Sequence, residues 1–176
     1  ILPVITSDTT LLHCFGNCVT DGTCGGDPCL QSVPFNEPFS ASLPNCWSMS
    51  GGENWLFNTS GPNHVGNGGA LSGSTTSGGH YAVVDASGHS GDAILSSPNV
   101  DISSLTNPEL SFFLISDNEG TPYSSTLTVM VNGSMAASYT GNTNGWEQKI
   151  IDLSTYTSPV QVDFVFSEPT TGSAFY

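Results

Sequence analysis

Cysteine is the residue type whose pattern says most about possible chemistry in this chain of 176 residues. All five cysteines fall within its first 46 positions. They are Cys14, Cys18, Cys24, Cys29 and Cys46. Together with His13 they could bind zinc, but zinc sites favour two closely spaced cysteine pairs, and the first four cysteines are separated by three, five and four residues. The glycine- and proline-rich surroundings favour disulfides instead, which form in an oxidising compartment. We predict disulfides, with Cys46 bonded back to the earlier group, one cysteine left over and an extracellular location.

Catalytic motifs are weaker than the cysteine pattern. Gly88-His89-Ser90-Gly91 is one residue short of the Gly-x-Ser-x-Gly motif of a nucleophile elbow. The histidines do not form the His-Glu-x-x-His motif of a zinc protease. Paired carboxylates for glycoside cleavage could come from any of fifteen acids, which sequence spacing does not place. We predict a protein that is not an enzyme and has no organic cofactor.

Charge restricts the partners of the chain. Charged residues make up 9% of the sequence, against roughly 25% in an ordinary globular protein. Lys149 is the single base, and the net charge is -14. Such a surface repels phosphate backbones and anionic lipids, so nucleic acid is excluded as a partner. Membrane insertion is excluded too, because no run reaches the ~18 apolar residues of a spanning helix.

Two sequons offer attachment points for glycans. Asn58-Thr59-Ser60 and Asn132-Gly133-Ser134 both match the Asn-x-Ser/Thr pattern. In a secreted eukaryotic chain, Asn58 and Asn132 are therefore candidate glycosylation sites.

Short strands separated by turns are the elements that must position these residues. Residues 1–10 read as a short apolar strand, Ile1–Thr6, followed by a linker, and residues 11–32 read as a cysteine-rich knot. From residue 33 to 176, alternating apolar runs stand between Gly, Ser, Asn and Pro, without a helical stripe. The predicted strands cover residues 80–85, 92–96, 109–115, 125–131, 135–139, 147–153 and 159–166.

Two of these strands carry additional information. The run 109–115 is densely apolar, which predicts a strand in the interior of a sheet. In the last strand, Val160, Val162, Phe164 and Phe166 share one face. The strand of 125–131 turns through Asn132-Gly133, a strong hairpin signal. The fold class predicted is all-β: an antiparallel β-sandwich of jelly-roll type with a small disulfide-rich N-terminal segment.

Several phrases occur in an order that resembles a known family. Among them are Phe39-Ser40-Ala41-Ser42-Leu43-Pro44-Asn45-Cys46-Trp47, Glu53-Asn54-Trp55, Gly79-His80-Tyr81-Ala82-Val83-Val84-Asp85, Gly145-Trp146-Glu147 and Ile151-Asp152-Leu153-Ser154. Residues 33–176 resemble the MAM domain, the adhesion module of meprins and receptor phosphatases. They are especially similar to the MAM-like jelly rolls of secreted bacterial surface proteins.

The resemblance implies a non-catalytic, extracellular role in adhesion, self-association or glycan contact. It also implies a structural calcium ion, for which the matching positions are Glu53, Asn54, Asp85 and Glu37. Oxygen ligands of this kind suit Ca²⁺. The partner expected is either a second copy of the chain or a glycan or protein of the cell surface. The alternatives are a calcium-dependent carbohydrate-binding module and an accessory domain of a secreted hydrolase.

The resemblance further implies one more strand than this sequence supplies, since relatives continue beyond the equivalent of Phe175-Tyr176. A sandwich without that strand has an open edge, and unpaired backbone groups at a buried edge are costly. Ile1, Leu2, Val4 and Ile5 lie in the extra N-terminal strand. We predict that this strand completes the sheet of a neighbouring copy and that repetition builds a filament. The alternatives are that it pairs with its own domain, or that the sequence is truncated at its C-terminus.

Overall fold

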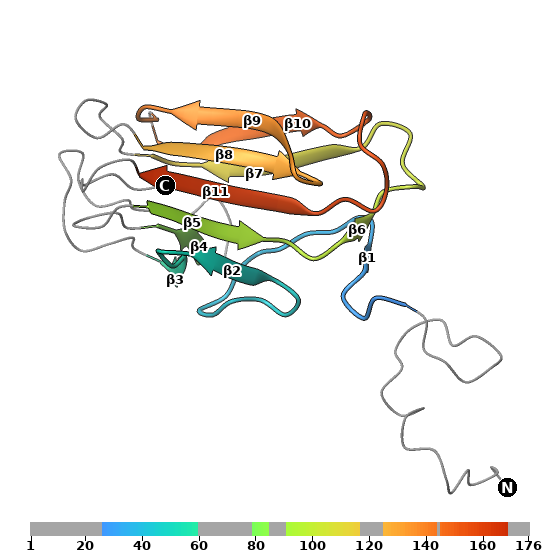
Figure 1. Ribbon diagram of the computed structural model, residues 1–176, viewed down its shortest axis with the longest axis horizontal. Helices are drawn as coiled ribbons and strands as arrows, with labels where there is room; N and C mark the ends of the chain where they lie inside the picture. Colours follow the sequence, from blue (N-terminus) through green and yellow to red (C-terminus); the bar gives the residue numbers. More distant parts are fainter. Residues whose placement is uncertain (1–25, 60–78, 85–90, 117–124, 144, 169–176) are drawn as a thin grey trace, which may run out of the picture.

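The computed structural model describes residues 26–59, 79–84, 91–116, 125–143 and 145–168, and every regular element among them is a β-strand (Figure 1). The strands are β1 (Gln31–Ser32), β2 (Ser48–Gly51), β3 (Leu56–Asn58), β4 (Tyr81–Val83), β5 (Gly91–Ser96), β6 (Val100–Asp101), β7 (Glu109–Leu114), β8 (Thr126–Val131), β9 (Ser134–Thr140), β10 (Glu147–Asp152) and β11 (Val162–Glu168). The predicted all-β class is confirmed. Within the described residues there is no helix that could cross a membrane.

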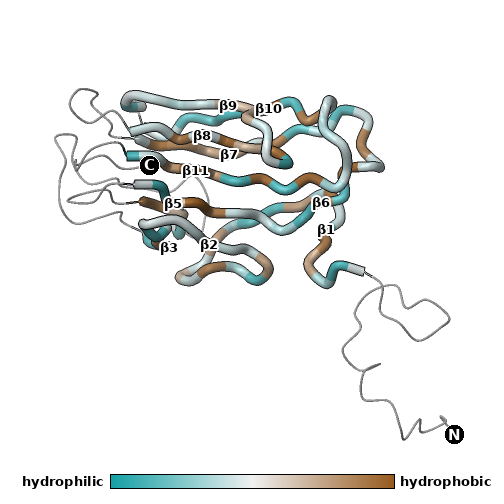
Figure 2. The backbone as a smooth tube through the Cα atoms, in the orientation of Figure 1, coloured by the Kyte–Doolittle hydropathy of each residue, from teal (hydrophilic) through white to brown (hydrophobic). Residues whose placement is uncertain are grey.

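Five strands form the larger layer of the sandwich, in the order β2-β5-β11-β8-β9, and all their pairings are antiparallel. β11 lies at the centre of this sheet, paired with β5 on one side and with β8 on the other. On its predicted inner face, Val162 and Phe166 are buried and Phe164 is partly buried, and Val160 is buried just before the strand begins. Figure 2 shows hydrophobic residues along β5 and a paler, more polar β9 at the sheet edge.

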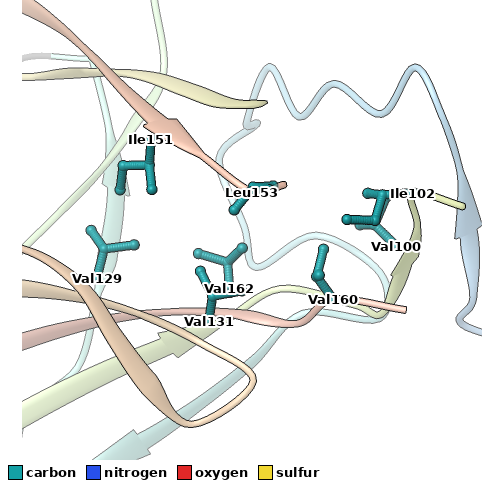
Figure 3. Packing of buried hydrophobic residues seen from close by; sticks show 8 residues of the cluster. All are labelled: Val100, Ile102, Val129, Val131, Ile151, Leu153, Val160 and Val162. Atoms are coloured by element: carbon teal, nitrogen blue, oxygen red, sulfur yellow. The ribbon is translucent and has the colours of Figure 1, made fainter. Parts of the chain in front are cut away.

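The facing layer consists of two separate strand pairs. β7 and β10 pair antiparallel, with Glu147 opposite Leu114 and Asp152 opposite Glu109. β3 and β4 form the other antiparallel pair. Figure 3 shows Ile151 and Leu153 on the β10 side, turned toward Val129 and Val162 of the large sheet. A second cluster joins Trp55 and Leu114 of this layer to Leu95 and Phe166.

The strand pairs of the smaller layer leave a gap between them. In the part of the chain that the structure describes, no strand pairs with the edge of β7 that faces away from β10. Residues 33–39, which follow β1, form no regular element. β1 itself pairs in parallel with β6 at one end of the sandwich, with Gln31 opposite Val100. Strand β7, expected in a sheet interior, therefore has one paired neighbour among the described residues.

The described residues decide none of the predicted domain boundaries. The N-terminal strand of residues 1–10 and the first part of the knot lie outside the described residues. The boundary between residues 32 and 33 stays a prediction.

Candidate functional site

An apolar cavity of about 570 Å³ lies between the two layers, in the gap beside β7. Its floor is the inner face of the five-stranded sheet, where Leu95, Leu127 and Val162 are buried. Its walls are β7 on one side and, on the other, residues 33–39 together with the start of β4. Binding pockets for small ligands have volumes of roughly 300–1,000 Å³, so the cavity is large enough to hold a ligand or a peptide segment.

The lining of the cavity is not restricted to the residues on the inner face of β7. Successive side chains of a strand point to opposite faces of the sheet. All six residues of β7 nevertheless line the cavity, and so does Ile115. Leu114 is buried on the inner side, whereas Ser111 and Phe113 are exposed on the outer side. The lining therefore includes residues from both faces of β7, and the edge of β7 that no described strand pairs with carries N–H and C=O groups able to pair with another strand.

Aromatic side chains in the lining of the groove pack against one another in pairs. The ring of Phe112 meets that of Phe164 edge-on, with centroids 5.2 Å apart. Tyr81 and Trp146 form a similar edge-on pair at 5.2 Å. Such pairs contribute beyond their burial and hold each ring at a defined angle. Burial raises the pKa of Tyr81 above its usual value. The rings therefore keep the groove walls apart and apolar.

The indole nitrogen of Trp47 is a polar atom in the mostly apolar lining of the groove. The ring of Trp47 packs edge-on against Phe39 at 5.4 Å. Its Nε1 is buried and has no hydrogen-bond acceptor among the described residues. By contrast, Nε1 of the buried Trp55 donates to the carbonyl oxygen of Ala93 at 3.2 Å. Of the three tryptophans, Trp55 is buried, and Trp47 and Trp146 are partly exposed.

The charged groups at the groove are acidic. Glu37 and Glu109 line it, and Oε1 of Glu37 accepts a hydrogen bond from the backbone N–H of Phe39 at 2.9 Å. Lys149, the single base of the chain, does not line the cavity. Its Nζ lies 2.7 Å from Oε2 of Glu147 and 5.3 Å from the ring centre of Tyr139. A negatively charged ligand would thus meet repulsion here, and an uncharged apolar one would be accepted.

The predicted calcium ligands are only partly described. The backbone N–H of Glu53 donates to the carbonyl oxygen of Asp92 at 3.3 Å, and Asn54 is exposed. Glu37 lies in the groove wall. Asp85 falls outside the described residues. In the described ranges, no group of three or more His, Cys, Asp or Glu side chains is placed to hold a metal. The calcium ion stays a prediction.

The two candidate glycosylation sites lie in different surroundings. Asn58 ends strand β3 and is partly buried. Asn132 is exposed, but its side chain is fully engaged. Its Nδ2 donates to the carbonyl oxygens of Thr157 and Pro159 at 3.0 and 3.1 Å, and its Oδ1 accepts from the N–H of Gln161 at 2.8 Å. A sugar on Nδ2 would replace one of these two donated hydrogens. Glycosylation at both positions stays a prediction.

The disulfide prediction is confirmed for one pair. Cys46 is bonded to Cys29, with their Cα atoms 5.4 Å apart, so the start of the sandwich is tied back to the knot as expected. Cys14, Cys18 and Cys24 lie outside the described residues, and so do Ile1, Leu2, Val4 and Ile5. The prediction that one cysteine is left without an intrachain partner stays a prediction.

The groove itself is a feature that sequence reasoning did not locate. The open edge was expected, but not the strand that carries it. The signal was the densely apolar run of residues 109–115, which has one paired neighbour among the described residues. That pattern is typical of a strand covered on both sides.

Two solved structures share this fold. The chain is similar to the K1 cleaved adhesin domain of Lys-gingipain from Porphyromonas gingivalis W83, with a TM-score of 0.55 and 15% identity over 76% of this chain and 87% of that one. The K3 cleaved adhesin domain of the same protein gives a TM-score of 0.54 and 13% identity over 76% of this chain and 88% of that one. No protein-family model matches the chain, and no curated protein sequence matches it either. The β-sandwich architecture is thus shared with adhesin domains, and the resemblance to the MAM domain stays a prediction.

Proposed function

We propose that this chain is an extracellular, non-enzymatic domain with an adhesive or structural role. Its sandwich has the fold of two bacterial adhesin domains. The Cys29–Cys46 disulfide is typical of proteins exported to an oxidising space. The surface carries few charges and a net charge of -14, which favours protein or glycan contacts over phosphate-rich partners.

The single observation that carries the mode of action is the groove beside β7, at the strand edge that has no partner among the described residues. An exposed strand edge above an apolar floor is the geometry in which an extended segment adds to a sheet. We propose that the chain associates with itself through a donated N-terminal strand, Ile1–Thr6. Because donor and acceptor are different surfaces, the contact is heterologous, and its repetition produces a filament.

Removing the donor strand tests this function. Full-length protein is expected to sediment as a series of oligomers and to form fibres visible by negative-stain electron microscopy. A variant lacking residues 1–10 is expected to sediment as a monomer and to form no fibres. Identical size distributions for the two proteins, measured by analytical ultracentrifugation at the same concentration, would contradict self-association by strand donation.

Carbohydrate binding is the second candidate, and the partly exposed ring of Trp146, which packs edge-on against the buried Tyr81 in the lining of the groove, favours it. Aromatic rings of this kind can stack on the apolar face of a sugar. This function predicts a saturable change of tryptophan fluorescence on titration with sugars, abolished by Trp146→Ala and, if calcium takes part, by a chelator. A role as an accessory domain of a secreted hydrolase predicts instead a catalytic domain elsewhere in the same precursor.

A further inference from the structure

We propose that the acceptor for the donated strand is the free edge of β7, and that strand Ile1–Thr6 of a second copy fills the groove beside it. This inference rests on the proposed function, which supplies the strand from a second copy. The inference adds the strand edge with which the donor pairs and the register of that pairing. Both decide whether the contact buries apolar surface.

The other sheet edges of the described sandwich are poorer acceptors. β9 forms one edge of the large sheet, and its residues are small, polar or exposed, with Met135 68% exposed. β2 forms the opposite edge with only four residues, and it ends at Gly51 in a positive-φ conformation. The cavity touches no residue of β9, β10 or the β2 strand itself. Neither edge of the large sheet therefore lies beside the apolar cavity, as β7 does.

The donor segment matches this edge in length and polarity. Strand β7 has six residues, and Ile1–Thr6 has six. Ile1–Ile5 is also the longest apolar run in the parts of the chain outside the described residues. It carries no side-chain charge, which suits a groove whose charged groups are Glu37 and Glu109.

Both faces of the donor strand are apolar, and each would lie against apolar residues at the groove. Toward the inside lies the floor formed by Leu95 and Val162. Toward the outside lies Phe113, 46% exposed on the outer face of β7, with Ile150 on the neighbouring strand also exposed. A donor strand would cover the floor with one set of side chains and lie beside Phe113 with the other.

Pro3 sets the register. Proline has no N–H, so it cannot donate to a sheet partner. In a strand, alternate residues direct their backbone groups to opposite sides. Pro3 must therefore face residues 33–39, which form no strand, while Leu2, Val4 and Thr6 pair with β7.

Two measurements on the protein test whether Ile1–Thr6 is the donor. They are the amide hydrogen-exchange rates of β7 and the sedimentation of the oligomers. Val4→Asp places a charge in the proposed contact, and Thr9→Asp places the same charge in the linker. We expect Val4→Asp to abolish oligomers and to speed exchange of the edge-facing amides of β7 by about 100-fold, because pairing protects them. Thr9→Asp should leave both unchanged.

A second pair of variants tests the acceptor. Phe113→Asp alters the β7 edge, and Met135→Asp alters the rival edge at β9. Both side chains are exposed, so the sandwich should fold in each case, which unchanged exchange in β8 and β11 would verify. We expect Phe113→Asp to weaken association at least about tenfold and Met135→Asp to leave it unaltered, since an unpaired charge beside an apolar strand opposes its docking.

Several outcomes would overturn the acceptor assignment. One is loss of oligomers in Met135→Asp but not in Phe113→Asp. Another is β7 protection that survives dilution to monomers, which would place the protecting strand in the same chain. A third is protection lost only when residues 169–176 are deleted, which would make the C-terminal segment the occupant. In all three cases strand donation could still occur at another edge, whereas a wild-type protein without oligomers would overturn the proposed function itself.

Discussion

At the scale of single residues, Asn132 connects two parts of the sandwich through the hydrogen bonds of its side chain. It stands in a left-handed conformation (φ 49°) before Gly133 (φ 75°), as the predicted Asn-Gly hairpin requires. Its side chain also makes three hydrogen bonds to the backbone of Thr157, Pro159 and Gln161. The turn that joins β8 to β9 is thereby fastened to the segment leading into β11.

Replacing Asn132 separates this structural role from glycosylation. Asn132→Ala removes three hydrogen bonds and a side chain that tolerates positive φ, so we expect a loss of about 2 kcal/mol in the free energy of unfolding. Ser134→Ala destroys the same sequon at an exposed side chain and should change the stability little. Urea unfolding of both variants, made without glycosylation, provides the measurement. Equal stabilities would show that the hydrogen bonds of the Asn132 side chain contribute nothing.

Asp101 makes the stability depend on pH in acid. Its carboxylate is hydrogen-bonded by the side chain and the backbone N–H of Ser103 and by Ser158, and these bonds lower its pKa to about 2. Since the pKa is depressed in the folded state, the contribution to stability is complete above the unfolded pKa near 3.8. It is lost as the pH falls from about 4 to about 2.

Urea midpoints between pH 2 and pH 5 test this dependence. Wild-type protein should lose stability over this range, and Asp101→Asn should lose less, because an amide does not titrate. Asp152, whose pKa is lowered by Ser154, keeps part of the slope in the variant. A pH dependence identical to that of the wild type would rule out Asp101 as a contributor.

At the scale of elements, the longer strands could be predicted from the sequence, whereas most of the short ones could not. The predicted strands of residues 92–96, 109–115 and 125–131 correspond to β5, β7 and β8 within one residue at each end. β1, β2, β3 and β6 have two to four residues, too few to show an alternating pattern. They pair because the rest of the fold brings them beside a partner strand.

The β2–β5 pairing depends on a glycine. Gly51 has φ 106°, and a Cβ atom there would collide with the backbone carbonyl of Asp92 in β5. At the adjacent Gly52, a Cβ would have nothing within 4 Å. We expect Gly51→Ala to lower the unfolding free energy by about 3 kcal/mol, from strain and from displacement of β2.

Gly52→Ala is the matched control and should change the stability by less than about 1 kcal/mol. Thermal unfolding followed by circular dichroism compares the two variants. If both unfolded at the same temperature as the wild type, the close approach of β2 to β5 would not be a feature of the protein in solution.

At the scale of the whole molecule, one covalent link joins the knot to the sandwich. The Cys29–Cys46 bond spans 17 residues and encloses β1 together with residues 33–39, which form a wall of the groove. A cross-link of this span restricts the unfolded chain and stabilises the folded one by about 3 kcal/mol.

The double variant Cys29→Ser/Cys46→Ser tests the effect of this link. We expect it to lose about 3 kcal/mol of unfolding free energy and to expose the groove wall, which increased proteolysis within residues 33–39 would reveal. The urea midpoint of the unreduced wild type is the reference. An unchanged midpoint and an unchanged digestion pattern would show that the wall holds its place without the disulfide.

The amino-acid sequence by itself determined the β-sandwich class, the inner face of β11, the Asn132-Gly133 turn and the pairing of Cys46 with the knot. These features depend on alternation, turn chemistry and cysteine position, which are local properties of a chain. Only the tertiary structure decided which strand has an edge without a partner among the described residues, because a free edge depends on which strands lie side by side. The groove is built from residues as distant as Phe35, Tyr81, Phe112 and Val162, and no local pattern brings them together.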